Sequence, residues 1–245
     1  MSTSIILVFG AAGAGKTTFC KKMKESLNYK LINIDPAQES QSNNITYDHD
    51  IVDYITVDEV MNEMDFGPNG GLFECLRQMV EALNEPSDFM NSLIEDDIYV
   101  VDCPGQIELF LHSEVMIDLI EFFKSKTQNI LITYLIESSN FENDKILYSS
   151  LCSSISLSRF YLPVINILSK ADQLKEEIDF DRIYSIEEFI KGKKTKFIQT
   201  CIDYVDMNGY GSYLPLNWTE PSSINLLSSQ IDIILQRDDQ IDNKN

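Results

Sequence analysis

The chain has 245 residues, of which 44% are hydrophobic and 10% aromatic, and its 39 Asp+Glu outnumber its 19 Lys+Arg to give a formal net charge of −20. This composition can bury a large core and excludes a chain that is disordered throughout. The acidic excess repels nucleic-acid phosphates and anionic lipid head groups, so we expect neither direct nucleic-acid binding nor membrane association.

The cysteines and the lengths of the apolar runs bear on the compartment. The five cysteines are odd in number and widely spaced, so we expect free thiols in a reducing compartment. The apolar run that begins at Ile5 is too short for a secretory signal, and no apolar run reaches the roughly 18 residues of a membrane-spanning helix. We therefore expect a protein of the cytoplasm, or one that moves between the cytoplasm and the nucleus.

Short apolar runs alternate with segments of helical period, which is the pattern of β-α-β units in a mostly parallel sheet with helices on both faces. In chain order the runs predict strands over Ile5–Phe9, Lys30–Ile34, Ile98–Val101, Ile130–Ile136 and Val164–Leu168. The helical period predicts helices over Thr17–Leu27, Leu72–Leu83, Ser113–Lys126, Asp144–Phe160 and Asp181–Lys191, and a last helix with the apolar stripe Ile224, Leu227, Ile231 and Ile234.

The sequence shows no clear domain boundary. No repeat or Pro/Ser-rich linker divides the chain, which predicts a single domain over residues 1–238 followed by a polar tail over residues 239–245. The stretch Gln38–Asp65 is the least regular part and is rich in Asn, Asp and Ser. Long insertions of this kind in a compact domain are usually functional.

The strongest chemical signal is the octapeptide Gly10–Thr17, which fits G-x-x-x-x-G-K-S/T between a predicted strand and a predicted helix. Its glycines allow successive backbone N–H groups to surround a phosphate, and the helix N-terminus adds its positive end. Lys16 would reach the β- and γ-phosphate oxygens, and the Thr17 hydroxyl would bind Mg²⁺. The sequence therefore predicts a P-loop NTPase fold that binds a nucleoside triphosphate.

A second string, Asp102-Cys103-Pro104-Gly105-Gln106, follows the apolar strand over Ile98–Val101. An aspartate at a strand end can hold Mg²⁺, and the backbone N–H of Gly105 can contact the γ-phosphate. Gln106 and Glu108 can reach a water in line with that phosphate. Glu108 has the alternative interpretation of an acid favoured by the helix dipole.

The string Ser169-Lys170-Ala171-Asp172 stands where a guanine-reading N-K-x-D motif would lie. In that motif the aspartate accepts hydrogen bonds from guanine donors that adenine lacks, so Asp172 is the predicted residue for base specificity. Serine at position 169 replaces an asparagine that would brace the loop, which leaves strict guanine preference open. A turn closed by an aspartate cap is the alternative interpretation. We expect the residues that close over the base to lie near Leu214–Leu216.

The string Phe66–Gly71 places Asn69 between a proline and two glycines, ahead of a predicted helix. By composition alone it is a turn before a helix. Taken with the other strings it resembles the GPN-loop GTPases, a family named for the tripeptide that is here Gly67-Pro68-Asn69. The resemblance runs from Ile5 to about Leu235 and includes Asn33–Ala37, Phe66–Leu72 and Asp102–Leu109.

The resemblance implies a Mg²⁺-dependent GTPase that cycles between GTP and GDP and works as a homodimer or as a heterodimer with a paralogue. It implies that Asn69 acts in the partner's site, that Asp35 lies near Mg²⁺ and the attacking water, and that Gln106 and Glu108 position this water. It further implies a role in assembly and nuclear import of RNA polymerase II or III, with RNA polymerase subunits as partners. The residues expected to bind nucleotide are Gly10, Gly13, Ala14, Gly15, Lys16, Thr17, Thr18, Gly67, Pro68, Gly105, Ser169, Lys170 and Asp172, and those expected to bind Mg²⁺ are Thr17, Asp35 and Asp102.

The four arginines, Arg77, Arg159, Arg182 and Arg237, all lie outside the nucleotide motifs. Phosphoryl transfer is usually assisted by an added cation, so a neutral donor such as Asn69 and the backbone must supply the stabilisation, or catalysis is slow. Two other interpretations remain at this point. One is a nucleotide-gated interaction module with negligible hydrolysis, and the other, less favoured by so few arginines, is a small-molecule kinase.

Overall fold

The computed structural model describes residues 3–37, 45–83, 97–138, 145–174, 178–190 and 194–235. Contacts along the chain divide it into two compact units, the first made of residues 1–9 and 16–130 and the second of residues 10–15 and 131–245. The single domain predicted over residues 1–238 stays a prediction, and the tail predicted over residues 239–245 lies outside the described residues.

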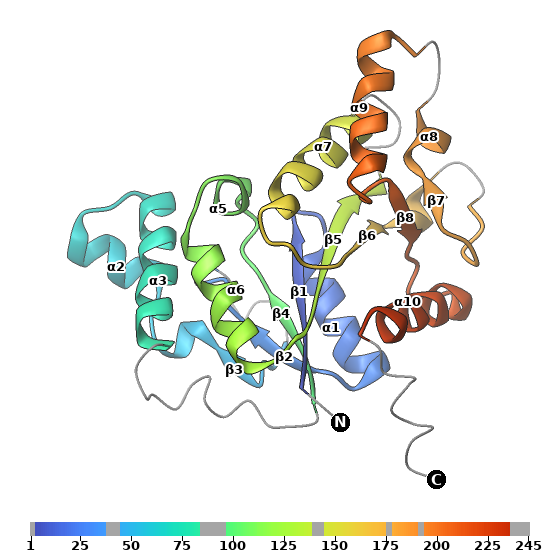
Figure 1. Cartoon of the computed structure of the whole chain (residues 1–245). Helices are drawn as coiled ribbons and strands as arrows, with labels where there is room; N and C mark the ends of the chain where they lie inside the picture. The colour runs from blue at the N-terminus through green and yellow to red at the C-terminus, as the bar shows by residue number, and fades with distance from the viewer. Residues whose placement is uncertain are drawn as a thin grey trace. The chain divides into compact units, whose positions relative to one another are not determined.

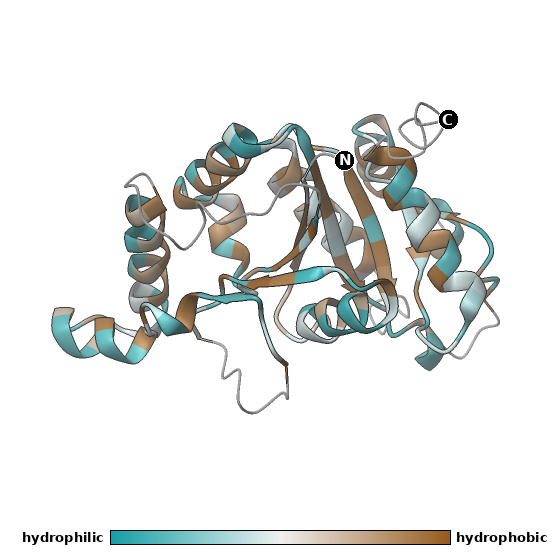
Figure 2. Ribbon diagram, turned by 90° about the horizontal axis from the view of Figure 1, so that it is seen from below, coloured by the Kyte–Doolittle hydropathy of each residue, from teal (hydrophilic) through white to brown (hydrophobic). Residues whose placement is uncertain are grey.

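In the first unit four parallel strands lie in the order β3-β2-β4-β1. Their bounds are Ser4–Gly10 for β1, Lys30–Asn33 for β2, His49–Asp50 for β3 and Ile98–Asp102 for β4. All residues of β1 and β4 are buried, because helices cover both faces. The strands of both units are mostly hydrophobic, as the brown colour of Figure 2 shows.

The helices of the first unit are α1 (Lys16–Leu27), α2 (Val57–Met64), α3 (Pro68–Leu83), α5 (Ile107–Leu111) and α6 (Val115–Lys126), with a 3₁₀ turn, η2, over Ile51–Asp53. Helix α1 lies on one face of the strands, and α3 and α6 lie together on the other (Figure 1). The helix α2 packs against α3. This arrangement brings the carboxyl ends of β2 and β4 to one edge, where their loops begin.

The second unit has the strand order β5-β6-β8-β7, in which β7 alone is antiparallel. The strands are β5 (Asn129–Glu137), β6 (Val164–Ser169), β7 (Tyr184–Ser185) and β8 (Ser212–Pro215). The helical elements are α7 (Lys145–Ser158), η4 (Ala171–Gln173), α8 (Ile186–Phe189), α9 (Lys196–Met207) and α10 (Pro221–Ile234). Helices α7 and α9 pack side by side (Figure 1).

The predicted mostly parallel α/β fold with helices on both faces is confirmed, and one element prediction is wrong. A helix over Asp181–Lys191 is replaced by β7 and the short helix α8, because Tyr184 pairs with Tyr213 and Ser185 with Glu188 forms a capping box that starts the helix at Ile186. The stretch Gln38–Asp65, which is the least regular part of the sequence, contains β3, η2 and α2 within its described residues, and α2 begins at a capping box of Thr56 and Glu59.

All five cysteines are free thiols, as predicted. Four of them are buried and Cys152 is partly exposed. Within the described ranges, no helix has the length and apolarity that a membrane crossing requires.

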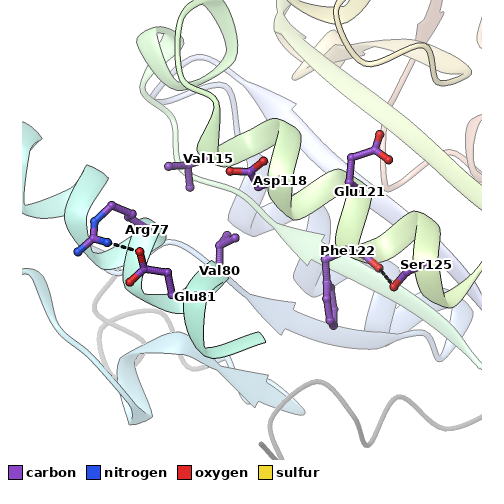
Figure 3. Close-up of a pocket in the computed structure, with 8 residues that line it drawn as sticks. All are labelled: Arg77, Val80, Glu81, Val115, Asp118, Glu121, Phe122 and Ser125. Atoms are coloured by element: carbon purple, nitrogen blue, oxygen red, sulfur yellow. Dashed lines mark hydrogen bonds and ion pairs between the residues drawn. The ribbon is translucent and has the colours of Figure 1, made fainter. Parts of the chain in front are cut away.

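A groove of about 540 Å³ lies between α3 and α6 in the first unit (Figure 3). Val80, Val115 and Phe122 give it apolar lining, and charged side chains stand around them. Arg77 pairs with Glu81 on its own helix, so part of this charge is neutralised locally. The residues of the nucleotide motifs do not line this groove, which makes it separate from the site described next.

Candidate nucleotide-binding site

The phosphate loop joins β1 to α1, and its residues 10–15 belong to the second unit. Gly10, Gly13 and Gly15 have φ of 146°, 80° and 90°, a region that side chains disfavour. A Cβ atom at Gly10 would also lie 2.6 Å from the carbonyl oxygen of Leu135. The glycines of the motif are therefore required by the backbone, and the loop has the curled conformation that a phosphate needs.

Ser169 braces this loop, contrary to the expectation that serine at this position leaves it unbraced. Its hydroxyl donates a hydrogen bond of 2.7 Å to the carbonyl oxygen of Ala14. Ser169 is buried at the carboxyl end of β6, which directs its short side chain at the loop backbone. In this chain the Ser169 hydroxyl therefore stabilises the loop, a role that the N-K-x-D motif assigns to the amide group of an asparagine.

Lys170 also contacts the loop. It adopts a left-handed conformation with φ of 56°, and its Nζ atom donates to the carbonyl oxygen of Gly13 at 3.0 Å and to Glu137 at 2.7 Å. The Ser138 hydroxyl in turn donates to the Lys170 carbonyl oxygen at 2.6 Å. The loop after β6 and the phosphate loop are thus fixed to each other within the second unit.

Asp172 follows in η4 with its side chain exposed, where a base could reach it. The residues predicted to close over the base lie on the neighbouring strand. Leu214 and Pro215 are inside β8, and the backbone N–H of Leu216 donates to the Leu168 carbonyl oxygen at 2.9 Å. Leu214, Pro215 and Leu216 are all buried, so their side chains pack in the core of the second unit.

In the first unit Lys16, Thr17 and Asp102 lie together. Lys16 is 8% exposed in the first turn of α1, and Asp102 is 1% exposed at the carboxyl end of β4. Thr17 donates a hydrogen bond to the Asp102 carboxylate, and so does the Tyr47 hydroxyl, at 3.0 Å. Burial raises the pKa of Asp102, the two hydrogen bonds and Lys16 oppose this shift, and Asp35 adds to it.

Asp35 is held after β2 by an Asn33 side chain that has no exposed surface. The Asp35 backbone N–H donates to Asn33 Oδ1 at 2.9 Å, while Asn33 Nδ2 donates to Asp35 O at 3.2 Å and to Asp50 at 2.8 Å. Burial raises the pKa of Asp35, and a hydrogen bond from the Ala37 backbone and the charge of Lys16 lower it. The buried Asp102 carboxylate and the half-buried Asp35 carboxylate repel each other when both are charged, and a cation bound between them would relieve this repulsion.

The donor set fits Mg²⁺ rather than a protein-only metal cage. No group of three or more His, Cys, Asp or Glu side chains that could hold a metal occurs in the part of the chain that the structure describes. Mg²⁺ in nucleotide sites takes one or two carboxylates together with substrate phosphates and waters, so the Thr17 hydroxyl, Asp102 and Asp35 are chemically sufficient.

Gln106 has a buried acceptor that is unsatisfied. Its Oε1 atom has no hydrogen-bond partner among the described residues, and leaving a buried acceptor unpaired costs about 1–3 kcal/mol. It lies directly before α5 and after Gly105, on the loop that leaves β4. Such an acceptor is suited to orient a water molecule. Glu108, by contrast, is exposed in the first turn of α5, as the helix-dipole interpretation expects.

The Gly-Pro-Asn tripeptide begins a helix earlier than predicted. Helix α3 starts at Pro68 rather than at Leu72, with the Gly71 N–H donating to the Gly67 carbonyl oxygen at 2.9 Å. The segment Gly67–Gly70 is exposed. A Cβ atom at Gly71 would lie 2.9 Å from Met61 Cγ, so this glycine allows α2 to approach α3. Asn69 is therefore presented on the surface by a well-packed helix start.

Tyr47 and Asn33 are site residues to which no sequence motif assigned a role. Asn33 had a local signal, because an Asn two residues before an Asp at a strand end commonly hydrogen-bonds the backbone. Tyr47 had none, since it lies in the irregular stretch and meets Asp102 only through the fold.

Asp102 also affects stability. Because its pKa is higher in the folded state than in an unfolded chain, the folded state binds the extra proton, and the free energy of unfolding falls as pH rises from the unfolded to the folded pKa. The ionised carboxylate therefore destabilises the nucleotide-free protein at neutral pH. We expect Asp102→Asn, which keeps the shape, to raise the unfolding temperature of the nucleotide-free protein by about 2–4 °C. GTP should raise the unfolding temperature of the unmodified protein, and the part of this rise that depends on Mg²⁺ should be absent in the Asp102→Asn variant.

Thermal unfolding with and without GTP and Mg²⁺ measures both effects. Asp118→Asn, an exposed aspartate on α6, is the matched control and should change neither. A lower unfolding temperature for the Asp102 variant without nucleotide would contradict the argument from burial.

A parallel α/β fold with a glycine-rich loop before a buried lysine, and an aspartate at a neighbouring strand end, defines the class of P-loop NTPases. A family model described as a conserved hypothetical ATP binding protein matches residues 8–237. Proteins named GPN-loop GTPase 3 from Dictyostelium discoideum and Saccharomyces cerevisiae are 31% and 33% identical, and the matches cover 100% and 96% of this chain and 91% and 93% of theirs. The chain belongs to the GPN-loop GTPase family.

A solved structure supports the fold. It is the apo form of a GTPase from Pyrococcus abyssi, which is 21% identical and has a TM-score of 0.72 over 94% of this chain and 97% of that chain. The predicted P-loop fold is thereby confirmed. The description of the family model names ATP, whereas the names of the relatives denote GTPases. The choice between guanine and adenine is therefore tested separately below.

Proposed function

We propose that this protein binds GTP together with Mg²⁺ and hydrolyses it. The observation that carries the proposal is the phosphate loop Gly10–Thr17, with its strained glycines and buried Lys16, followed in the chain by Asp102 hydrogen-bonded to Thr17. Membership of the GPN-loop GTPase family favours GTP among the nucleotides.

In this proposal Lys16 and the loop N–H groups bind the phosphates, while Thr17, Asp102 and Asp35 hold the metal. Mg²⁺ supplies charge neutralisation on the phosphate oxygens when bound. The unpaired Oε1 atom of Gln106 accepts a hydrogen bond from the attacking water and so orients it. Glu108 is assigned a supporting role at the same water.

We further propose that the site is completed by a dimer, either of two copies or with a paralogue. Arg77 is engaged by Glu74 and Glu81, and Arg182 pairs with Glu188, so neither is directed at a phosphate of its own chain. Asn69 is exposed on the start of α3 and can enter another molecule's site. A neutral donor supplied by the partner then does what an arginine does in other phosphoryl-transfer enzymes.

Phosphate release from GTP with Mg²⁺, measured over a series of protein concentrations, tests this function. We expect turnover per subunit to rise with concentration and to cease when Mg²⁺ is chelated. GTP binding with negligible turnover at all concentrations would favour a nucleotide-gated interaction module or a heterodimer. Phosphate transfer from ATP to a small acceptor would favour the kinase alternative.

Base recognition by Asp172 has its own expected result. We expect GDP to displace a bound fluorescent GDP analogue at least about 100-fold more effectively than ADP, and Asp172→Ala to reduce this ratio about 10-fold or more, because hydrogen bonds to a charged group are lost. Asp179→Ala, an exposed aspartate in the same unit, is the matched control. Equal displacement by GDP and ADP in the unmodified protein would overturn the assignment of GTP.

The family resemblance also supports a cellular proposal. We assign the protein to assembly and nuclear import of RNA polymerase II, in the cytoplasm with shuttling to the nucleus and with polymerase subunits as partners. The net charge of −20 is compatible with a protein partner and opposes direct nucleic-acid binding. Purification of the tagged protein in its GDP state and with a non-hydrolysable GTP analogue should recover polymerase subunits in one state preferentially. Their absence in both states would contradict this role.

A further inference from the structure

Tyr47 reaches the metal-binding edge of the first unit from a segment distant in sequence. Its hydroxyl donates a hydrogen bond of 3.0 Å to Oδ2 of Asp102, a side chain that is 1% exposed. Thr17 donates to the same carboxylate. The Cys20 thiol, also on α1, has a side-chain hydrogen bond with Asp102 as well. Tyr47 is therefore the donor to this carboxylate that comes from the chain between β2 and β3, whereas Thr17 and Cys20 both belong to the phosphate-loop helix.

The backbone on both sides of Tyr47 is fixed independently of this contact. Lys24 of α1 donates through Nζ to the Thr46 carbonyl oxygen and to Asp48 Oδ2, each at 2.9 Å. Asp48 also accepts from the Leu31 N–H at 2.8 Å and donates its own N–H to the Leu31 carbonyl oxygen at 2.8 Å. The Tyr47 ring is thus held in place by its neighbours, and its hydroxyl is preorganised for Asp102.

Hydrogen bonds of this kind orient a metal-binding carboxylate. A carboxylate has about four acceptor positions, and a fixed donor on one of them determines how the others face the metal. Loss of such an outer partner typically lowers metal affinity by about 10–100-fold. Hydroxyl donors are suited to this task, since they align the carboxylate without adding charge.

We propose that Tyr47 is a positioning residue for Asp102, and that the segment Thr46–Asp48 is thereby coupled to Mg²⁺ occupancy. This inference rests on the proposed binding of GTP with Mg²⁺ and adds to it the residue that sets the metal affinity. Lys24 and Asp48 act through Tyr47, since they hold its backbone.

The variant Tyr47→Phe keeps the ring and removes the hydroxyl. The measured quantity is the Mg²⁺ concentration at half-maximal binding of a fluorescent GDP analogue, together with the affinity for the same analogue in excess chelator. We expect the Mg²⁺ midpoint to rise about 10-fold and the affinity in chelator to stay within about twofold, because the hydroxyl acts on the metal site alone. Tyr161→Phe, which is 90% exposed in the second unit, should change neither quantity.

A second variant separates positioning from general damage to the fold. Lys24→Gln should raise the Mg²⁺ midpoint in the same direction, and the double variant with Tyr47→Phe should raise it by less than the product of the two effects, because both act through one hydroxyl. An unchanged or lower midpoint in Tyr47→Phe would overturn the inference, as would an equal loss of affinity in chelator or fully independent effects of the two variants. Absence of any Mg²⁺ dependence in the unmodified protein would overturn the proposed function instead.

Discussion

Replacing Lys16 with alanine should reduce GTP turnover by about 10³-fold or more, the largest effect that we expect from a single change. Lys16 is buried in the first turn of α1, and its charge lowers the pKa of both Asp35 and Asp102. A cation that neutralises the transferring phosphoryl group contributes about 10³–10⁵ in rate. Single-turnover hydrolysis at saturating GTP measures this loss.

The control for this variant is Lys22→Ala. Lys22 lies on the same helix, and its Nζ atom pairs with Glu25 at 2.8 Å on the exposed side. Its removal should leave turnover within about twofold, since an exposed ion pair contributes little to stability. A Lys16 variant that keeps more than a tenth of the turnover would show that this lysine does not bind the phosphates.

Replacing Asn69 with alanine should lower turnover about 100-fold while GDP affinity stays unchanged. Removal of one preorganised donor from a transition state costs about 10²–10³ in rate. Asn69 is exposed at the start of α3, so the substitution should not affect folding. The dependence of turnover on protein concentration should disappear together with the activity, because the donor acts in the partner's site.

Asn62→Ala on α2 is the matched control, since Asn62 is an exposed asparagine on a neighbouring helix of the same unit. Equal turnover in the Asn69 and Asn62 variants would exclude a catalytic role for Asn69. A fall in the unfolding temperature of the Asn69 variant would instead assign it to the helix start. Mixing the Asn69 variant with an excess of a Lys16→Ala variant should restore part of the turnover, because each chain then supplies what the other lacks.

Local spacing determined much of the site. The octapeptide Gly10–Thr17 identified the phosphate loop, because its glycines and Lys16 must follow one another in the backbone. Asp102 and Ser169 were located in the same way, at the ends of runs that are apolar enough to be buried strands. At these positions the motif and the predicted strands and helices support the same interpretation, because all of them depend on residues that are close in sequence.

Errors occurred where residues far apart in sequence decide the structure. The segment near Tyr184 pairs with β8 instead of extending a helix, and helix α2 forms in the least regular stretch of the sequence and packs against α3. The bracing role of Ser169 depends on Ala14, which is remote in sequence but adjacent in the fold. Periodicity and motif spacing give no information about which residues that are remote in sequence come into contact.

The sequence by itself determined the class of fold, the phosphate loop and the residue types at the strand ends, because burial and backbone conformation follow from local periodicity and from glycine. The tertiary structure alone decided that Tyr47 and Thr17 meet on Asp102, that Gln106 keeps an unpaired acceptor and that Asn69 is exposed on the start of a helix. Hydrogen bonding and burial of polar groups depend on which side chains come within about 3 Å of each other, and the packing of distant segments sets that distance.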